Sequence, residues 1–433
     1  MGEFPGGKID CVHDFLQMMT PTGTCRIYPA AADEFLDNPD LKENTSVMNR
    51  CVVERALAKL VISGVIGFGT IAVAQQEVAN AVRTTVDLGP QVALTVPIAP
   101  TPVPIGNHVD LVYELHLTNY DHRALTLEKL EVLSSQGTKP LVTFEGNALT
   151  NILGPGELNA DLKAHTLAPR QLMVAYIWLE MRPDGVATHL SHHLTFEVDL
   201  RTEQLEGAAV DIGTHPPIAI GPPVRGGNWI ATNIGNDTVH RRLVVIPKDT
   251  AVIGTRFATD WCKKGENGWT NREHSPLRNE DVYCYGAEVL AVADSTVSSI
   301  VDGIAENQHP DALPSSSNWQ TLTGNRVILD MGGSVFAIYA HLQRESIRVK
   351  PGQRVRQGEV LGLIGNSGFS EGPHLHFQLA NAGGLTGEGI PYVLTEYDSF
   401  GIDIGGKPLD SSKRYTVRGR FPEPDEVIAF PGK

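Results

Sequence analysis

The chain has 433 residues and a formal net charge of −15, with 43 glycines and 28 prolines. This length allows two or three domains, and the many turn-forming residues beside few long helical patterns favour β structure. A nucleic-acid partner needs a basic protein surface, so the negative charge argues against nucleic-acid binding.

Residues 48–74 have the pattern of a secretory signal peptide. A basic start precedes an uncharged run over residues 60–74, which is short for a bilayer span, and Ala72-Val73-Ala74 is a small-x-small cleavage site. A buried core helix and an uncleaved anchor are the alternatives. Residues 1–47 show no periodicity, and we interpret them as a doubtful leader before a true start at Met48. We therefore expect a secreted or periplasmic protein with no stable membrane span after cleavage.

Two segments follow this predicted signal. Residues 75–104 are predicted to be an extended linker because prolines are dense at their end. Over residues 105–220, short stretches of alternating apolar and polar residues are separated by turn clusters, which predicts an immunoglobulin-like β-sandwich. Its histidines have no metal-ligand spacing and are predicted to lie on solvated strand faces: His108, His116, His165, His189, His192 and His193.

A second Pro/Gly-rich stretch near residues 221–227 marks the next domain boundary, and residues 226–400 are predicted to form a separate β-rich domain. In its first part, residues 241–246 and 250–255 are predicted to pair as a hairpin that turns at Lys248-Asp249. Residues 401–433 carry no recognisable motif and are interpreted as a C-terminal tail.

The most informative motif is the run Gly372-Pro373-His374-Leu375-His376-Phe377-Gln378-Leu379. In a β-strand, alternate side chains share one face, so His374 and His376 would point the same way while the apolar residues between them face a core. Two imidazoles about 7 Å apart can hold a metal with one ring and do acid–base work with the other. A pair of ordinary polar strand residues is the alternative for this motif alone.

Two further motifs precede that run, Tyr339-Ala340-His341-Leu342 and the glycine-punctuated residues 358–368. With the HLHF run, they resemble the lysostaphin-type zinc endopeptidases, which cut bacterial cell-wall peptides. The resemblance covers roughly residues 257–379. It implies that Asp260 and His376 are zinc ligands and that His341 and His374 are catalytic.

The resemblance fails at one ligand. The family has a histidine four residues before the aspartate ligand, but this chain has Arg256 there. A guanidinium has no acceptor lone pair and cannot bind zinc. His240 is the preferred replacement, because the predicted hairpin would place it beside position 256. His274 and a site without a third ligand remain open.

Cys262 and Cys284 are predicted to form a disulfide, because they are the two cysteines that remain in an exported protein after signal cleavage. A zinc-binding role is disfavoured, since these cysteines form no CxxC spacing and there is no third thiol after residue 51.

These observations predict an exported zinc metalloendopeptidase that hydrolyses peptide bonds, with peptidoglycan peptides as the substrate class implied by the resemblance. The alternative is a metal-free relative that binds peptidoglycan or regulates a partner hydrolase. Arg256 favours this alternative. The presence of Asp260, His341, His374 and His376 together favours the enzyme, because a groove that only binds needs none of them.

Overall fold

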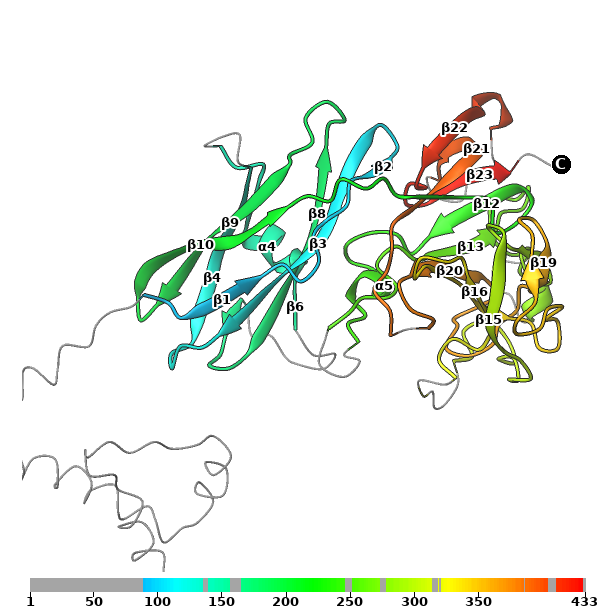
Figure 1. Cartoon of the computed structure of the whole chain (residues 1–433), viewed down its shortest axis with the longest axis horizontal. Helices are drawn as coiled ribbons and strands as arrows, with labels where there is room; N and C mark the ends of the chain where they lie inside the picture. The colour runs from blue at the N-terminus through cyan, green and yellow to red at the C-terminus, as the bar shows by residue number, and fades with distance from the viewer. Residues whose placement is uncertain are drawn as a thin grey trace, which may run out of the picture. The chain divides into compact units, whose positions relative to one another are not determined.

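The computed structural model in Figure 1 describes residues 89–134, 139–155, 165–245, 251–272, 278–313, 318, 321–384, 386–403 and 410–430. The predicted leader and signal peptide, His274 and the predicted turn at Lys248-Asp249 lie outside these residues. Among the described residues the regular secondary structure is almost entirely β-strand, which confirms the all-β prediction. Its helices are all too short or too polar to span a bilayer.

The first domain consists of two sheets. One sheet has the order β1-β3-β8-β6, with β2 also paired to β3, and comprises β1 (Val92–Thr95), β2 (Val103–Ile105), β3 (His108–Asn119), β6 (Leu153–Pro155) and β8 (Leu172–Met181). The other has the order β10-β9-β4-β5, with β7 on β4, and comprises β4 (Leu125–Ser134), β5 (Val142–Glu145), β7 (Thr166–Leu167), β9 (His189–Val198) and β10 (Arg201–Asp211). The helix α4 (Gly146–Ile152) lies between β5 and β6 in the chain. A single apolar cluster contains residues of both sheets, as expected for a sandwich.

Two details of this domain differ from the sequence-based expectation. β1 lies within the predicted linker and β2 overlaps its end, and both pair with β3. β2 contains Pro104 and pairs with β3 alone in its sheet, and such an edge strand tolerates a proline that a central strand does not. His192 is fully buried rather than solvated, and its Nε2 atom lies 2.9 Å from the Tyr113 hydroxyl.

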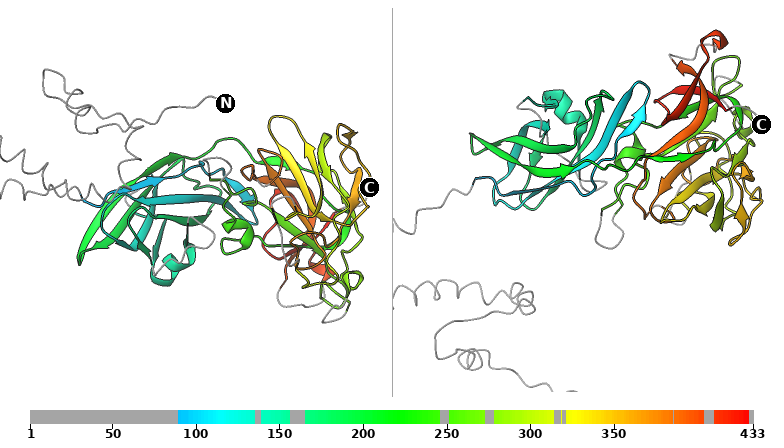
Figure 2. Two further views of the ribbon diagram at one scale, coloured as in Figure 1. Left: turned by 90° about the horizontal axis from the view of Figure 1, so that it is seen from below. Right: turned by 45° about the horizontal axis from the view of Figure 1, so that its top comes forward.

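The second domain is organised around one long sheet, visible from further sides in Figure 2. Within the described residues its order is β11-β21-β23-β12-β13-β20-β17-β16-β15-β18, with β22 on β21. Its strands are β11 (Ile218–Ile220), β12 (Gly226–Thr232), β13 (Thr259–Lys263), β15 (Ser295–Val301), β16 (Asn325–Asp330), β17 (Phe336–Leu342), β18 (Arg354–Val355), β20 (Leu375–Ala380), β21 (Tyr392–Ile402), β22 (Tyr415–Arg420) and β23 (Glu426–Phe430). A separate pair is formed by β14 (Glu288–Leu290) and β19 (Val360–Leu363), and short helices are α5 (Val239–Arg242), η3 (Asn279–Asp281) and η4 (Ser411–Lys413).

Two segments of this domain differ from the predicted secondary structure. β22 and β23 lie within the predicted tail, and β23 is paired on both sides, with β12 and β21. The predicted hairpin survives among the described residues as a single bridge between Val245 and Val252. Residues 241 and 242, predicted as the start of a strand, belong to α5, which has Thr238 as its N-cap; the Thr238 hydroxyl accepts a hydrogen bond from the Arg241 amide.

Candidate metal centre and active site

Three adjacent strands at the middle of the long sheet bring the predicted site residues together. β20 pairs with β13 on one side and β17 on the other, and Asp260 of β13 is directly opposite His376 of β20. Cross-strand partners in such a sheet share a face. The Asp260 Oδ1 and His376 Nδ1 atoms are 3.0 Å apart, and both residues are buried.

His240 reaches the same place from α5. Its Nε2 atom lies 3.4 Å from Asp260 Oδ2, and its ring centroid lies 4.7 Å from that of His376. Each of these three residues offers a ligand atom within 4.8 Å of the others, and theirs is the one such group of His, Cys, Asp or Glu found in the described part of the chain. His240 thus lies in this group, and the Val245–Val252 bridge has the register of the predicted hairpin, although residues 241 and 242 belong to α5 and not to a strand.

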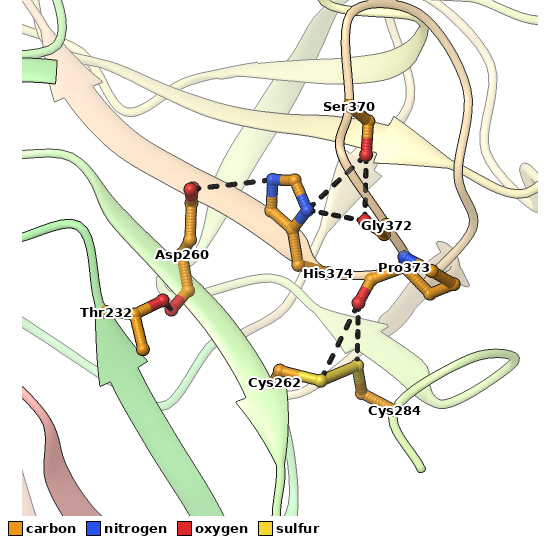
Figure 3. The surroundings of a disulfide bond; sticks show 8 residues. All are labelled: Thr232, Asp260, Cys262, Cys284, Ser370, Gly372, Pro373 and His374. Carbon is orange, nitrogen blue, oxygen red and sulfur yellow. Dashed lines mark hydrogen bonds and ion pairs between the residues drawn. A yellow bond between two sulfur atoms is a disulfide. The ribbon is translucent and has the colours of Figure 1, made fainter. Parts of the chain in front are cut away.

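His341 and His374 lie beside this group. The His341 ring centroid is 4.8 Å from that of His374 and 5.9 Å from that of His376. His374 Nε2 lies 3.6 Å from Asp260 Oδ2, and Figure 3 shows this ring between Asp260 and the Gly372 carbonyl. His341 has a positive φ of 60°, so the regular alternation of β17 stops at this residue.

The tautomers of both rings follow from their partners. His374 Nδ1 is 2.8 Å from the Gly372 carbonyl, and His341 Nδ1 is 2.8 Å from the Ser367 carbonyl. A carbonyl can only accept, so each Nδ1 carries a proton, and in the neutral form of either ring the lone pair is on Nε2. Burial, with His374 and His376 nearby, holds the pKa of His341 well below 6.5, so this ring is neutral at neutral pH.

Gln378 orients His376 from two positions further along β20. Its Nε2 donates to the Gly254 carbonyl, which turns its Oε1 toward His376 Nε2 at 2.8 Å. His376 therefore donates from Nε2 and directs Nδ1 toward the carboxylate. Sequence reasoning missed Gln378, although its i+2 spacing from His376 places it on the same strand face.

The donor set fits a cation, because one ring nitrogen of His376 and one of His240 face the Asp260 carboxylate. His376 Nδ1 lies 3.0 Å from Asp260 Oδ1, and His240 Nε2 lies 3.4 Å from Asp260 Oδ2. Burial lowers the pKa of His376, but the hydrogen bond to Asp260 outweighs burial, so this pKa is raised. Burial raises the pKa of Asp260, but the three nearby histidines outweigh burial and hold this pKa well below its usual range. Burial lowers the pKa of His240 to about 4, although Asp260 opposes that shift, so its ring is a neutral ligand at pH 7.

Arg256 does not enter this group. Its guanidinium contacts Glu114 and lies 2.8 Å from Glu388, and its side chain is almost completely buried. At the position where the family has a zinc ligand, this chain therefore has a buried arginine that pairs with two carboxylates outside the metal centre.

The predicted cysteine pair lies beside the HLHF run. The Cys262 and Cys284 Cα atoms are 5.3 Å apart with their sulfurs at bonding distance. Both sulfurs contact the Pro373 carbonyl, directly before His374 (Figure 3). The pair thus supports the loop that carries His374.

Part of the chain matches a known protein family. Residues 281–386 match Peptidase family M23, a range that contains His341, His374 and His376 but neither Asp260 nor His240. The peptidoglycan DD-endopeptidase ShyC of Vibrio cholerae is 31% identical over 123 residues, which is 28% of this chain and 26% of that protein. The endolysin of Staphylococcus phage 2638A is 40% identical over 115 residues, which is 26% of this chain and 22% of that protein.

Among solved structures, the catalytic domain of the M23 protein EnpA from Enterococcus faecalis aligns at 19% identity with a TM-score of 0.22, over 41% of this chain and 95% of that one. This chain spans about a quarter or less of the length of the curated relatives just described. The resemblance to lysostaphin-type peptidases is confirmed within the second domain. Residues 281–386 are a domain of Peptidase family M23.

Proposed function

We propose that this protein is an exported zinc-dependent endopeptidase that hydrolyses peptide bonds in bacterial peptidoglycan. The observation that carries the proposal is the convergence of His240, Asp260 and His376 within 4.8 Å, with two further histidine rings beside them. The peptidoglycan substrate is supported by the M23 match and by the printed activity of ShyC.

The zinc ion would be held by the His240 ring, the Asp260 carboxylate and His376 Nδ1. When bound, zinc supplies the Lewis acidity that makes water acidic enough to attack an amide carbonyl near neutral pH. Three protein ligands leave room for water and substrate, as catalytic zinc sites require.

His341 and His374 would do the proton chemistry. His374 directs Nε2 toward Asp260, and the His341 ring lies 5.9 Å from that of His376. In its neutral form, either ring can accept a proton from the attacking water and pass it to the leaving amine. Once protonated, the same rings are donors that can stabilise negative charge on the carbonyl oxygen. Their Nδ1 bonds to backbone carbonyls fix the orientation in which they do so.

The cysteine pair and the N-terminal signal pattern support export. A disulfide between Cys262 and Cys284 is stable in an oxidising compartment, which agrees with the predicted secretion or periplasmic location. We propose that this bond forms in the mature protein and holds the ends of β13 and of the Cys284 segment beside the site.

The alternative, a metal-free relative that binds peptidoglycan, drew its support from Arg256. The buried contacts of Arg256 with Glu114 and Glu388 give this residue another role, so its presence no longer counts against a metal.

The test combines metal binding with cleavage. Single Ala substitutions of His240, Asp260 and His376 should each reduce zinc occupancy and the release of peptides from purified peptidoglycan. His189→Ala is the matched control, because His189 lies 2.8 Å from Asp211 in a His–Asp pair outside the site. The binding-module alternative replaces the proposal if wild-type protein binds peptidoglycan but neither binds zinc nor releases peptides.

A further inference from the structure

One strand of the sandwich has its second face buried against the peptidase domain. On β3, Leu111 and Tyr113 lie in the sandwich core, whereas Val112 belongs to the core cluster of the second domain. Glu114, two residues further along the same face, has a side chain only 3% exposed. A carboxylate this buried is rarely found without a charged partner.

Glu114 lies between two arginines of the peptidase domain. Arg241 of α5 donates to Glu114 and also to the carbonyls of Tyr113 at 2.8 Å and Ile177 at 3.4 Å. Arg256 donates to the other carboxylate oxygen of Glu114 and pairs with Glu388. We name these four residues, Glu114, Arg241, Arg256 and Glu388, the Glu114 network; it balances two positive and two negative buried charges.

The neighbouring residues attach α5 to the sandwich as well. Arg242 donates to the Leu153 carbonyl at 3.1 Å, and its guanidinium lies 5.1 Å from the ring centroid of Tyr176. Asn236 donates to the Tyr176 carbonyl at 2.7 Å. A helix of four residues has little stability of its own, so these contacts must set its orientation.

His240 is the one residue of α5 that turns to the metal centre, and it directly precedes Arg241. Its backbone carbonyl is held by the Thr255 hydroxyl at 2.6 Å, and its ring faces Asp260. Because Arg241 and His240 are adjacent, the direction of the His240 ring depends on the anchoring of Arg241.

We propose that Glu114 of the sandwich is a positioning residue for the metal centre, which holds α5 through Arg241 so that His240 faces Asp260 and His376. The sandwich then orients His240, the ligand that replaces the histidine missing at position 256. This inference rests on the proposed zinc site.

The primary test is Glu114→Gln in the full-length protein, with zinc titrated alone. The amide keeps the shape of the side chain but leaves two buried arginines with one carboxylate. Loss of an outer-shell partner usually weakens metal binding about 10–100-fold, and we expect a decrease of this size. In the metal-free protein, hydrogen exchange of the amides at 239–242 should be faster than in wild type.

A matched control separates positioning from stability. Asp121 is also a buried carboxylate of the sandwich, and it is paired with Arg123 away from α5. Asp121→Asn should lower the unfolding temperature but leave zinc affinity and exchange at α5 unchanged. Equal losses of zinc affinity in both variants would overturn the inference.

A double variant tests the same point from the other side. Glu114→Gln with Arg241→Met removes one charge of each sign, so stability should recover relative to Glu114→Gln. Zinc affinity should stay low, because α5 has lost its anchor. Recovery of affinity together with stability would show that the network is structural only. If wild-type protein binds no zinc, the proposed function fails, whereas unchanged exchange at 239–242 in Glu114→Gln refutes the positioning role itself.

Discussion

Replacing Arg256 with Met tests whether this residue is a structural ion-pair partner instead of a defective ligand. The Arg256 side chain is 4% exposed and contacts Glu114 and Glu388. Without it, Glu114 keeps Arg241, but Glu388 loses its direct ion pair and keeps the Ile253 amide at 3.0 Å and the more distant charge of Arg241. Removal of one member of a buried ion pair costs about 3–5 kcal/mol, and we expect Arg256→Met to lose this much unfolding free energy.

Urea unfolding followed by tryptophan fluorescence measures this loss, because Trp229 and Trp261 are buried in the core cluster of the same domain. The double variant Arg256→Met with Glu388→Gln should recover most of the stability, since no unpaired charge remains. Zinc affinity should remain near the wild-type value. A loss below about 1 kcal/mol in the single variant, or a large loss of zinc binding with intact stability, would refute the reasoning.

Three further predictions follow from individual contacts. His341→Ala and His374→Ala should retain zinc but slow peptide release by about 10²–10⁴-fold, as expected for positioned acid–base groups; loss of zinc from either would assign them to the ligand set instead. Non-reducing peptide mapping should link Cys262 to Cys284, and Cys262→Ser with Cys284→Ser should cost roughly 3 kcal/mol in the chain-entropy model; free alkylation of both thiols in exported protein would contradict the disulfide. Burial lowers the pKa of His192 to about 4, so its unfolded form takes up a proton that the folded form does not as the pH falls from about 6.5 toward 4. Over that interval wild type should therefore lose about 3 kcal/mol more stability than His192→Gln, measured by urea unfolding at each pH; identical pH profiles would contradict it.

The sequence was most informative where local alternation and local motifs coincide. The strand character of the HLHF run is confirmed, since Leu375–Ala380 is β20. The family resemblance predicts that Asp260 and His376 share one site, and the structure places Asp260 directly opposite His376. These features depend on residues close together in the chain or on a recognisable motif.

Features that depend on distant partners were not predictable in the same way. In the sequence, the residues of α5 look like the start of a polar strand. The partner of Arg241 is Glu114, 127 residues away in sequence, so no local pattern indicates this contact. β23 is short and buried at every position, so it shows no alternation that could have distinguished it from a tail. His192 was interpreted as solvated because its buried partner Tyr113 lies on another strand.

Elemental analysis of the purified mature protein, prepared with zinc and without chelators, is the direct test of whether His240, Asp260 and His376 bind zinc. We expect one zinc ion per chain in wild type and a marked loss in His240→Ala, with His189→Ala unchanged. Wild-type protein without zinc, or a His240→Ala variant with full zinc content, would contradict it.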